Sequence, residues 1–181
     1  RLRPQVDELY LSANADIALY EALGFPVIPD ENSKARPFLG RGPLAGISAL
    51  LSELEEELQV EDLIQVASCD GPFLPLDLVE RLASAREEFR EAERREMGRA
   101  ITGATYPRSS EREHYTYLQA RAGDLWVTAE LLRDKDLRIR ALLKEISAKS
   151  VHFPSERAFT NCNNLDELAR LEEELKNDEK L

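Results

Sequence analysis

The chain has 181 residues, of which 43% are hydrophobic, with 8 glycines and 9 prolines, so it is long enough to form one domain with a sizeable core. Its 24 basic and 35 acidic residues give a net charge of −11, which argues against a nucleic-acid-binding or anionic-membrane-binding protein. The two cysteines lie far apart, and no apolar run approaches the ~20 residues of a membrane span, so we expect a cytoplasmic protein with reduced thiols.

The first part of the chain predicts two strands separated by a helix. Residues 6–12 have the apolar and aromatic content of a strand, and Asn14 follows at its carboxyl end. Residues 16–23 carry apolar side chains at helical spacing, and residues 25–28 predict a second strand that ends near Asp30. Each predicted strand is therefore followed by a polar residue.

A loop rich in glycine and proline precedes the next predicted helix, residues 47–58. Its sequence is Gly42-Pro43-Leu44-Ala45-Gly46. The backbone N–H groups at such a helix N-terminus favour an anion or the polar edge of a base. The same pattern is typical of a tight connection into an amphipathic helix that faces a sheet, so the sequence leaves both interpretations open.

The central stretch is an apolar run, residues 63–68, that stops at Asp70 and two turn residues. It lacks the alternation of a half-solvated strand, so we expect a strand that is covered on both faces. In open α/β sheets the carboxyl ends of the strands line the ligand crevice, where a carboxylate can hold a divalent ion against a phosphate. Asp70 is equally well interpreted as a turn aspartate that caps the helix after Pro75 or hydrogen-bonds its own backbone.

The rest of the chain predicts alternating helices and strands. A helix begins at Leu76, and its charged run, residues 87–96, predicts a solvated face with i,i+4 pairs. The further predicted elements are strands at 100–106, 115–120 and 150–153, helices at 124–133 and 136–146, and a final helix capped by Asn164. We interpret Trp126 as a core or lid residue, and Cys69 and Cys162 as packing thiols, because two thiols alone make a poor zinc site.

Four short motifs follow one another along the chain: Asn14 after one strand, Asp30 after the next, the Gly42–Gly46 loop, and Cys-Asp-Gly-Pro-Phe-Leu-Pro at residues 69–75. In this order and spacing they resemble the molybdopterin guanylyltransferases, the MobA-like nucleotidyltransferases. Residues 159–168, Phe-Thr-Asn-Cys-Asn-Asn-Leu-Asp-Glu-Leu, look like the closing motif of that family, and residues 138–143 are similar to its helix before the last strands. The resemblance spans nearly the whole chain.

The resemblance implies a three-layer α/β/α, Rossmann-like nucleotidyltransferase domain with a mostly parallel sheet. It implies that Asp70 is a catalytic residue and the magnesium ligand, and that Asn163, with Asn161 beside it, lies close to the metal and the phosphates. The implied nucleotide-binding residues are Asn14, Asp30, Gly42, Pro43, Leu44, Ala45 and Gly46, with Asp30 near the base or ribose. One carboxylate with amide oxygens makes a weak Mg²⁺ site that depends on the phosphate oxygens of the substrate.

The chain departs from the family in two segments. Family members begin with a strand and a glycine-rich loop, Leu-x-Gly-Gly-x-x-x-Arg-Met-Gly-x-x-Lys, which surrounds the triphosphate and has no counterpart here. Losing its donors raises the barrier by ~3 kcal/mol each, so we expect the chain as given to be inactive or nearly so. We expect a single domain, 1–181, that lacks the first strand and roughly 40 preceding residues. The second departure is at residues 114–119, His-Tyr-Thr-Tyr-Leu-Gln, where the family has His-Pro-Thr-Phe-Ala-Leu. His114 is interpreted either as a ligand of the pterin pyrophosphate or as a surface histidine.

The activity implied for the intact protein is Mg²⁺-dependent transfer of GMP from GTP to molybdopterin, with release of pyrophosphate. The terminal phosphate of the pterin is already anionic at neutral pH, so positioning and charge neutralisation carry the reaction without a general base. The implied partners are GTP, molybdopterin, and molybdoenzymes or cofactor-biosynthesis proteins. Two alternatives stay open: a cytidylyltransferase acting on molybdopterin or on a sugar or polyol phosphate, and a non-catalytic molybdopterin-binding adaptor for molybdoenzymes.

Overall fold

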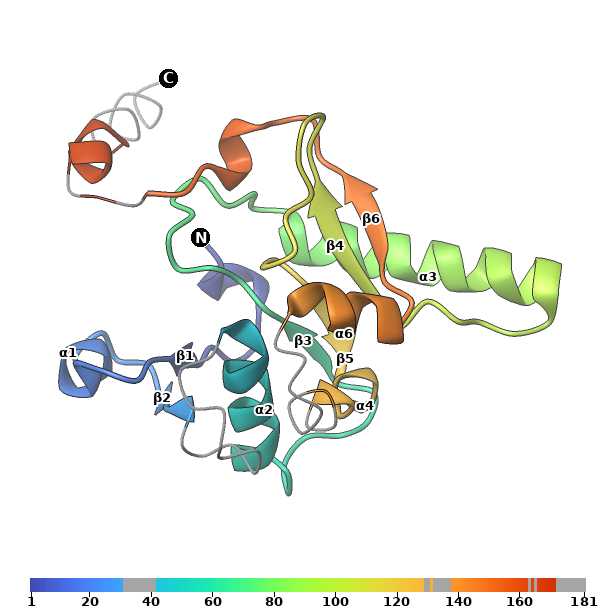
Figure 1. The fold of residues 1–181 in the computed structure, drawn as a ribbon, viewed down its shortest axis with the longest axis horizontal. Helices are drawn as coiled ribbons and strands as arrows, with labels where there is room; N and C mark the ends of the chain where they lie inside the picture. Colours follow the sequence, from blue (N-terminus) through green and yellow to red (C-terminus); the bar gives the residue numbers. More distant parts are fainter. Residues whose placement is uncertain (31–41, 129–130, 132–137, 163, 165, 172–181) are drawn as a thin grey trace.

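The computed structural model describes residues 1–30, 42–128, 131, 138–162, 164 and 166–171 (Figure 1). The strands are β1 Leu11–Ser12, β2 Val27–Ile28, β3 Leu63–Gln65, β4 Ala104–Arg108, β5 Gln119–Arg121 and β6 Lys149–His152. The α-helices are α1 Ile17–Glu21, α2 Pro43–Glu53, α3 Leu78–Met97, α4 Ala122–Leu125 and α6 Ile139–Glu145, and the 3₁₀ helices are η1 Arg3–Gln5 and η4 Arg157–Phe159. Residues 166–171 are also helical.

The strands form two sheets within the described residues. β1 and β2 make a short parallel pair, and the larger sheet has the order β3-β5-β4-β6. In that sheet β5 is antiparallel to both β3 and β4, whereas β4 and β6 are parallel. Three of its four strands therefore run in the same direction, as expected for a mostly parallel α/β sheet with one reversed strand.

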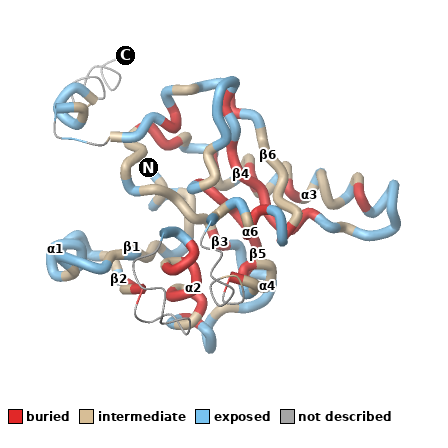
Figure 2. The backbone as a smooth tube through the Cα atoms, in the orientation of Figure 1, coloured by how far each residue is buried: buried red, intermediate tan, exposed pale blue. Residues whose placement is uncertain are grey.

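Helices cover both faces of the larger sheet. Alternate residues of β4 point to opposite faces: Tyr106 packs with the core under α2, α4 and α6, and the Thr105 hydroxyl donates to the Leu82 carbonyl of α3 at 3.0 Å. In Figure 1, α6 lies in front of β4 and β6 and α3 lies behind them, and Figure 2 shows the buried segments between these helix layers. This arrangement confirms the predicted three-layer α/β/α fold.

The central strand differs from its prediction. β3 ends at Gln65, and the side chain of Leu63 is 49% exposed, so the expectation of a strand covered on both faces is wrong at its beginning. The reason is its position: within the described residues, β3 is an edge strand of the larger sheet and not a central one. The next residue, Ile64, is buried and faces the core.

The long helix α3 also differs from its prediction. Its charged run, residues 87–96, was expected to form a solvated face, but Glu93 is 3% exposed, and Arg86, directly before the run, is 1% exposed. These side chains are buried because groups distant in sequence pair with them: Asp124 with Arg86 and Lys149 with Glu93. The prediction of a solvated face is therefore wrong at Glu93.

Two smaller predictions have opposite outcomes. Trp126, expected to be buried, is 46% exposed. At the start of the final helix, the Asn164 side-chain oxygen accepts a hydrogen bond from the Glu167 backbone N–H at 2.9 Å, which confirms the predicted N-cap. Among the described residues, no helix is long and apolar enough to cross a membrane.

Candidate functional site

Asp70 lies in a turn beyond the end of β3, beside the C-terminal segment of the chain. Its carbonyl accepts a hydrogen bond from the Cys162 backbone N–H at 2.7 Å, and its carboxylate oxygen Oδ1 accepts one from the Ser68 hydroxyl at 2.5 Å. Asn161, exposed, precedes Cys162 directly. The fold thus brings Asp70 and Asn161 to the same place, whereas Asn163 lies outside the described residues.

Asp70 does not cap the next helix. The N-cap residue of α3 is Asp77, and no side chain forms a capping hydrogen bond there within the described residues. The interpretation of Asp70 as the cap of that helix is therefore wrong. The Ser68 hydroxyl fixes one carboxylate oxygen of Asp70, which leaves the other oxygen to bind a cation or a water molecule.

Tyr117 supplies a buried hydroxyl next to this turn. The side chain is 1% exposed, and its hydroxyl has no hydrogen-bond partner among the described residues. It faces Gly71, where an added Cβ would overlap the hydroxyl oxygen and lie 3.3 Å from Cζ. Burial, and then the negative charges of Asp70 and Cys69, raise the pKa of Tyr117 to about 12, so the hydroxyl stays protonated and is a potential donor.

Sequence reasoning overlooked this hydroxyl, although a clue was present. Tyr117 occupies the position where the family pattern has phenylalanine, so the extra oxygen is the difference between the two side chains. Nothing in the local sequence could place that oxygen against Gly71, because the two residues meet only through the fold.

Besides the polar group of residues around Asp70, a second polar group of residues joins the segments at the ends of β1 and β2. The Asn14 amide donates to Asp30 Oδ2 at 2.9 Å, and its carbonyl oxygen accepts the Asp30 backbone N–H at 2.8 Å. The Ser12 hydroxyl makes a longer contact of 3.4 Å to Asp30 Oδ1. An added Cβ on Gly46 would lie 2.7 Å from the Ser12 hydroxyl oxygen, so a glycine is needed where α2 packs against these strand ends.

The Gly42–Gly46 loop combines a strained turn with core packing. Gly42 has a φ of 85°, a left-handed value that favours glycine, and Pro43 follows at the first position of α2. Leu44 is 0% and Ala45 is 2% exposed as whole residues, backbone included, whereas Gly42 and Pro43 are exposed. This burial agrees with a tight connection into a helix that faces the core, and a role of the loop in nucleotide binding stays a prediction.

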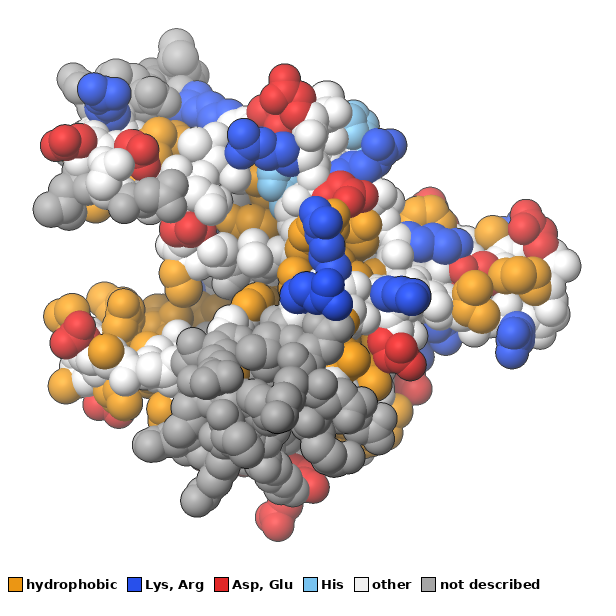
Figure 3. Space-filling view, in the orientation of Figure 1, with side chains coloured by type: hydrophobic (Ala, Val, Ile, Leu, Met, Phe, Trp, Pro, Cys, Tyr) orange, Lys and Arg blue, Asp and Glu red, His pale blue; other side chains and the backbone are white. Residues whose placement is uncertain are grey.

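The two polar groups lie toward the same end of the molecule. In Figure 1, α2 runs in the opposite direction to β3, so the N-terminus of α2 and the carboxyl end of β3 point the same way. Figure 3 shows the surface hollowed on this side, between the part with the C-terminal segment and the part with α1 and β1.

His114 is half-buried rather than free on the surface. Its ring stacks on Phe159 with centroids 4.3 Å apart, and its Nε2 lies 2.8 Å from the Ser109 hydroxyl. Burial lowers the pKa of His114, so the neutral ring predominates at pH 7. Because Phe159 belongs to the segment that continues to Asn161, His114 supports the position of that segment. A role in phosphate binding stays a prediction.

The described residues fit a magnesium ion bound together with a phosphate substrate, rather than a resident metal. No group of three or more His, Cys, Asp and Glu side chains in the described ranges could hold a metal ion. Mg²⁺ is commonly held by one or two carboxylates and completed by phosphate oxygens and water, which matches one strand-end aspartate with an exposed amide beside it. Cys69 and Cys162 are free thiols, but Cys69 is exposed, so its interpretation as a packing thiol is wrong.

A mixed α/β sheet with polar residues beyond the ends of its strands is the arrangement in which α/β proteins bind ligands. The structure is similar to molybdopterin-guanine dinucleotide biosynthesis protein A from Archaeoglobus fulgidus, with a TM-score of 0.57, 19% identity, and coverage of 93% of this chain and 78% of that one. It is also similar to 2-C-methyl-D-erythritol 4-phosphate cytidylyltransferase from Thermus thermophilus, with a TM-score of 0.56, 15% identity, and coverage of 96% and 85%. The fold is that of the Rossmann-like nucleotidyltransferases.

Sequence comparison identifies the family. Residues 1–151 match the model of the MobA-like NTP transferase domain, and the chain belongs to this family of nucleotidyltransferases. Relatives named molybdenum cofactor guanylyltransferase come from Burkholderia vietnamiensis, at 36% identity, and Burkholderia ambifaria, at 34%. Each alignment covers 94% of this chain and 78% of the relative. The predicted family resemblance is confirmed.

Proposed function

We propose that this protein transfers GMP from GTP to molybdopterin and releases pyrophosphate, as a step in molybdenum cofactor biosynthesis. The observation that carries the proposal is its similarity, at 34–36% identity over 94% of the chain, to proteins named molybdenum cofactor guanylyltransferase. The proposal includes a cytoplasmic location, which the free thiols of Cys69 and Cys162 support.

In this proposal Asp70 binds Mg²⁺ through the carboxylate oxygen that Ser68 leaves available, and Asn161 and Asn163 lie beside the metal and the phosphates. The hydrogen bond of 2.7 Å between the Asp70 carbonyl and the Cys162 amide supports this assignment, because it holds the two segments together before any ligand binds. The bound Mg²⁺ would neutralise charge on the phosphates of the nucleotide.

The nucleotide is proposed to lie between the Asp70 turn and the start of α2. Asn14 and Asp30 are held by a reciprocal pair of hydrogen bonds, at 2.9 and 2.8 Å, so their polar atoms would be in place before the guanosine part arrives. The backbone of residues 42–46 would contact the nucleotide at the N-terminus of α2.

The acceptor phosphate would attack the α-phosphorus without a general base, because it is already anionic at neutral pH. The oxygen–phosphorus bond to the acceptor forms as the bond to the β-phosphate breaks, and pyrophosphate leaves with the electron pair. The residues of this chain would therefore contribute by orienting the two phosphate groups and by excluding water.

The proposal is tested by incubating the full-length protein with molybdopterin, Mg²⁺ and GTP labelled at the α-phosphate. The expected result is a labelled GMP–molybdopterin product and one pyrophosphate per product. Label transfer from CTP but not from GTP would replace the proposal with the cytidylyltransferase alternative. Binding of molybdopterin without transfer from either nucleotide would favour the adaptor.

A further inference from the structure

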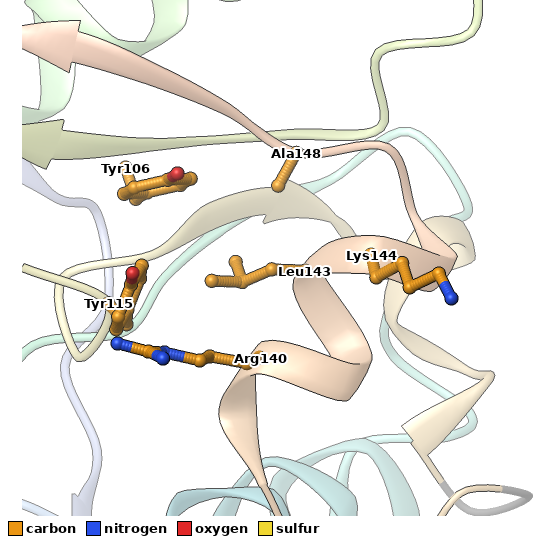
Figure 4. Close-up of a pocket in the computed structure, with 6 residues that line it drawn as sticks. All are labelled: Tyr106, Tyr115, Arg140, Leu143, Lys144 and Ala148. Atoms are coloured by element: carbon orange, nitrogen blue, oxygen red, sulfur yellow. The ribbon is translucent and has the colours of Figure 1, made fainter. Parts of the chain in front are cut away.

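A pocket outside the Asp70 site lies on the face of the larger sheet that α6 covers (Figure 4). Its volume is about 230 Å³, and its lining residues are Tyr106, Tyr115, Arg140, Leu143, Lys144 and Ala148. In Figure 4 the two tyrosine rings stand at one end, Leu143 points toward them from α6, and Lys144 points away at the far rim. None of these six lining side chains is acidic.

The tyrosine rings are held in place by one carboxylate. Glu113 accepts a hydrogen bond from the Tyr106 hydroxyl at 3.1 Å through one oxygen and a hydrogen bond from the Tyr115 hydroxyl through the other. The ring centroids lie 5.3 Å apart at an angle of 55°. Because both hydroxyls bind Glu113, the tyrosines present mainly their ring surfaces to the pocket.

Arg140 adds a positive charge at the aromatic end. Its side chain is exposed, and its Cζ lies 4.9 Å from the centroid of the Tyr115 ring. A guanidinium beside fixed aromatic rings suits a flat, conjugated ligand that carries an anionic group, because the rings contact its face and the guanidinium binds its charge. A polyol phosphate could bind the guanidinium through its phosphate, but it has no flat face to pack on the rings.

We propose that this pocket binds the flat heterocyclic part of the acceptor, an inference that rests on the proposed function. The acceptor is assigned here rather than the nucleotide because the predicted nucleotide residues Asn14 and Asp30 follow β1 and β2, whereas the pocket is lined by residues of β4 and α6 and of the segments before β5 and β6. Its volume of about 230 Å³ accommodates one ring system and is too small for a nucleoside triphosphate.

The chain itself connects the pocket with the Asp70 turn. Tyr115 lines the pocket, and Tyr117, two residues later, has its hydroxyl against Gly71. Two residues span at most about 7 Å of extended chain, so the backbone at the pocket and the backbone of Tyr117 are neighbouring parts of the molecule. Tyr115 also stands where the family pattern has proline, which makes this aromatic wall a feature of this chain.

The direct test is the binding of pterin-6-carboxylate, a flat anionic heterocycle, to the full-length protein. Quenching of the pterin fluorescence measures this binding. We expect Arg140→Ala to weaken binding about 10-fold, on the scale of one lost charge-assisted hydrogen bond. Arg94→Ala is the matched control, because Arg94 is an exposed arginine on α3, away from the pocket, and it should leave binding unchanged.

A second variant separates the two features of the pocket. Tyr115→Leu should weaken the binding of pterin-6-carboxylate more than the binding of glycerol 3-phosphate, whereas Arg140→Ala should weaken the binding of both ligands. The inference is overturned if the pterin does not bind or if Arg140→Ala behaves like Arg94→Ala. Equal weakening of both ligands by Tyr115→Leu would also overturn it.

These binding measurements need no turnover, so they separate the pocket from the proposed function. If GMP transfer is absent but the variants show the expected pattern, the proposed function fails and the pocket stands. If transfer occurs and Arg140→Ala leaves the acceptor KM unchanged, the pocket assignment fails while the proposed function holds. The expected result is a raised acceptor KM with an unchanged GTP KM.

Discussion

Glu93 on α3 and Asp70 beyond β3 are two carboxylates with opposite surroundings. Glu93 accepts hydrogen bonds from the backbone amides of Ile101 and Thr102, from the Thr102 hydroxyl, and from Lys149, at 2.6–2.9 Å. Among the described residues, the Asp70 carboxylate accepts one hydrogen bond, from Ser68. The fold satisfies the acid behind the sheet completely and leaves the acid at the strand end available to a ligand.

The difference separates structural charges from functional ones. A buried acid with all its donors inside the chain contributes to stability, and removing it leaves buried donors without acceptors. An acid with one donor contributes little to stability and retains an oxygen for a cation. The predictions below test whether this distinction holds on the two sides of the sheet.

The largest expected effect on stability is that of Glu93→Leu. It leaves two backbone amides and the Lys149 ammonium without their acceptor, so the free energy of unfolding should fall by about 3–5 kcal/mol. Glu91→Leu is the control, because exposed Glu91 makes only a surface pair with Arg95 at 3.6 Å and should cost less than about 1 kcal/mol. Urea unfolding measures both variants, and equal losses would contradict the comparison.

The pKa of Glu93 predicts how the stability of the fold depends on pH. Burial opposes its ionisation, but the hydrogen bonds from Lys149, Thr102 and Ile101 outweigh burial and lower the pKa of Glu93 from 4.5 to about 2. A carboxyl whose pKa is lower in the folded state stabilises the fold above the ordinary pKa, and this contribution is lost as the pH falls from about 4.5 toward 2. Urea unfolding between pH 5 and 2 should therefore show a steeper loss for the wild type than for Glu93→Gln, and parallel curves would contradict the assignment.

Gly71→Ala should have the next largest effect. The added Cβ would overlap the Tyr117 hydroxyl, so we expect a loss of about 1–3 kcal/mol in the free energy of unfolding. Tyr117→Phe removes the overlapping oxygen and leaves the nearest remaining ring carbon, Cζ, at 3.3 Å, so the double variant should recover much of that loss. Strictly additive effects in the double-mutant cycle would show that the hydroxyl does not face Gly71.

The smallest expected effect on stability is that of Asn14→Ala. It removes both hydrogen bonds to Asp30, and because Asn14 is exposed, the expected loss is about 1 kcal/mol. If Asn14 also helps to hold the nucleotide, GTP affinity should fall, as measured by calorimetry. Ser12→Ala, which removes only a contact of 3.4 Å, is the control. Unchanged GTP affinity in Asn14→Ala would make this residue purely structural.

Much of the fold could be predicted because local patterns and the structure agree. The apolar spacing after Leu76 predicted α3, and the apolar run before Asp70 predicted β3. The element ends were less accurate: β1 and β2 have two residues each, where the sequence predicted longer strands. Short strands are set by which neighbours pair with them, and composition does not encode that information.

The burial of charged residues could not be predicted from the sequence. The run on α3 has the pattern of a solvated helix face, and its pair of Glu91 with Arg95 fits that interpretation. Glu93 differs only because the sheet brings Lys149 and Thr102 against it. The contact of the Tyr117 hydroxyl with Gly71 is another long-range contact of this kind.

The family resemblance implied that Asn163, with Asn161 beside it, lies close to a metal bound by Asp70. The hydrogen bond from the Cys162 amide to the Asp70 carbonyl joins the segments of Asp70 and Asn161, whereas Asn163 lies outside the described residues. Their roles with metal and nucleotide stay predictions. The pocket at Tyr115 was not predicted, because it depends on how α6 lies over the sheet.

The most direct test is the rate of GMP transfer by Asp70→Asn in the full-length protein, measured over a range of Mg²⁺ concentrations. We predict a fall of roughly 100-fold at saturating GTP, with a nearly unchanged free energy of unfolding, since asparagine can still accept the Ser68 hydrogen bond. Asp7→Asn, which makes the same change at an exposed aspartate, should transfer GMP at the wild-type rate. An Asp70→Asn variant with wild-type turnover and an unchanged Mg²⁺ dependence would contradict the assignment of Asp70 as the metal-binding carboxylate.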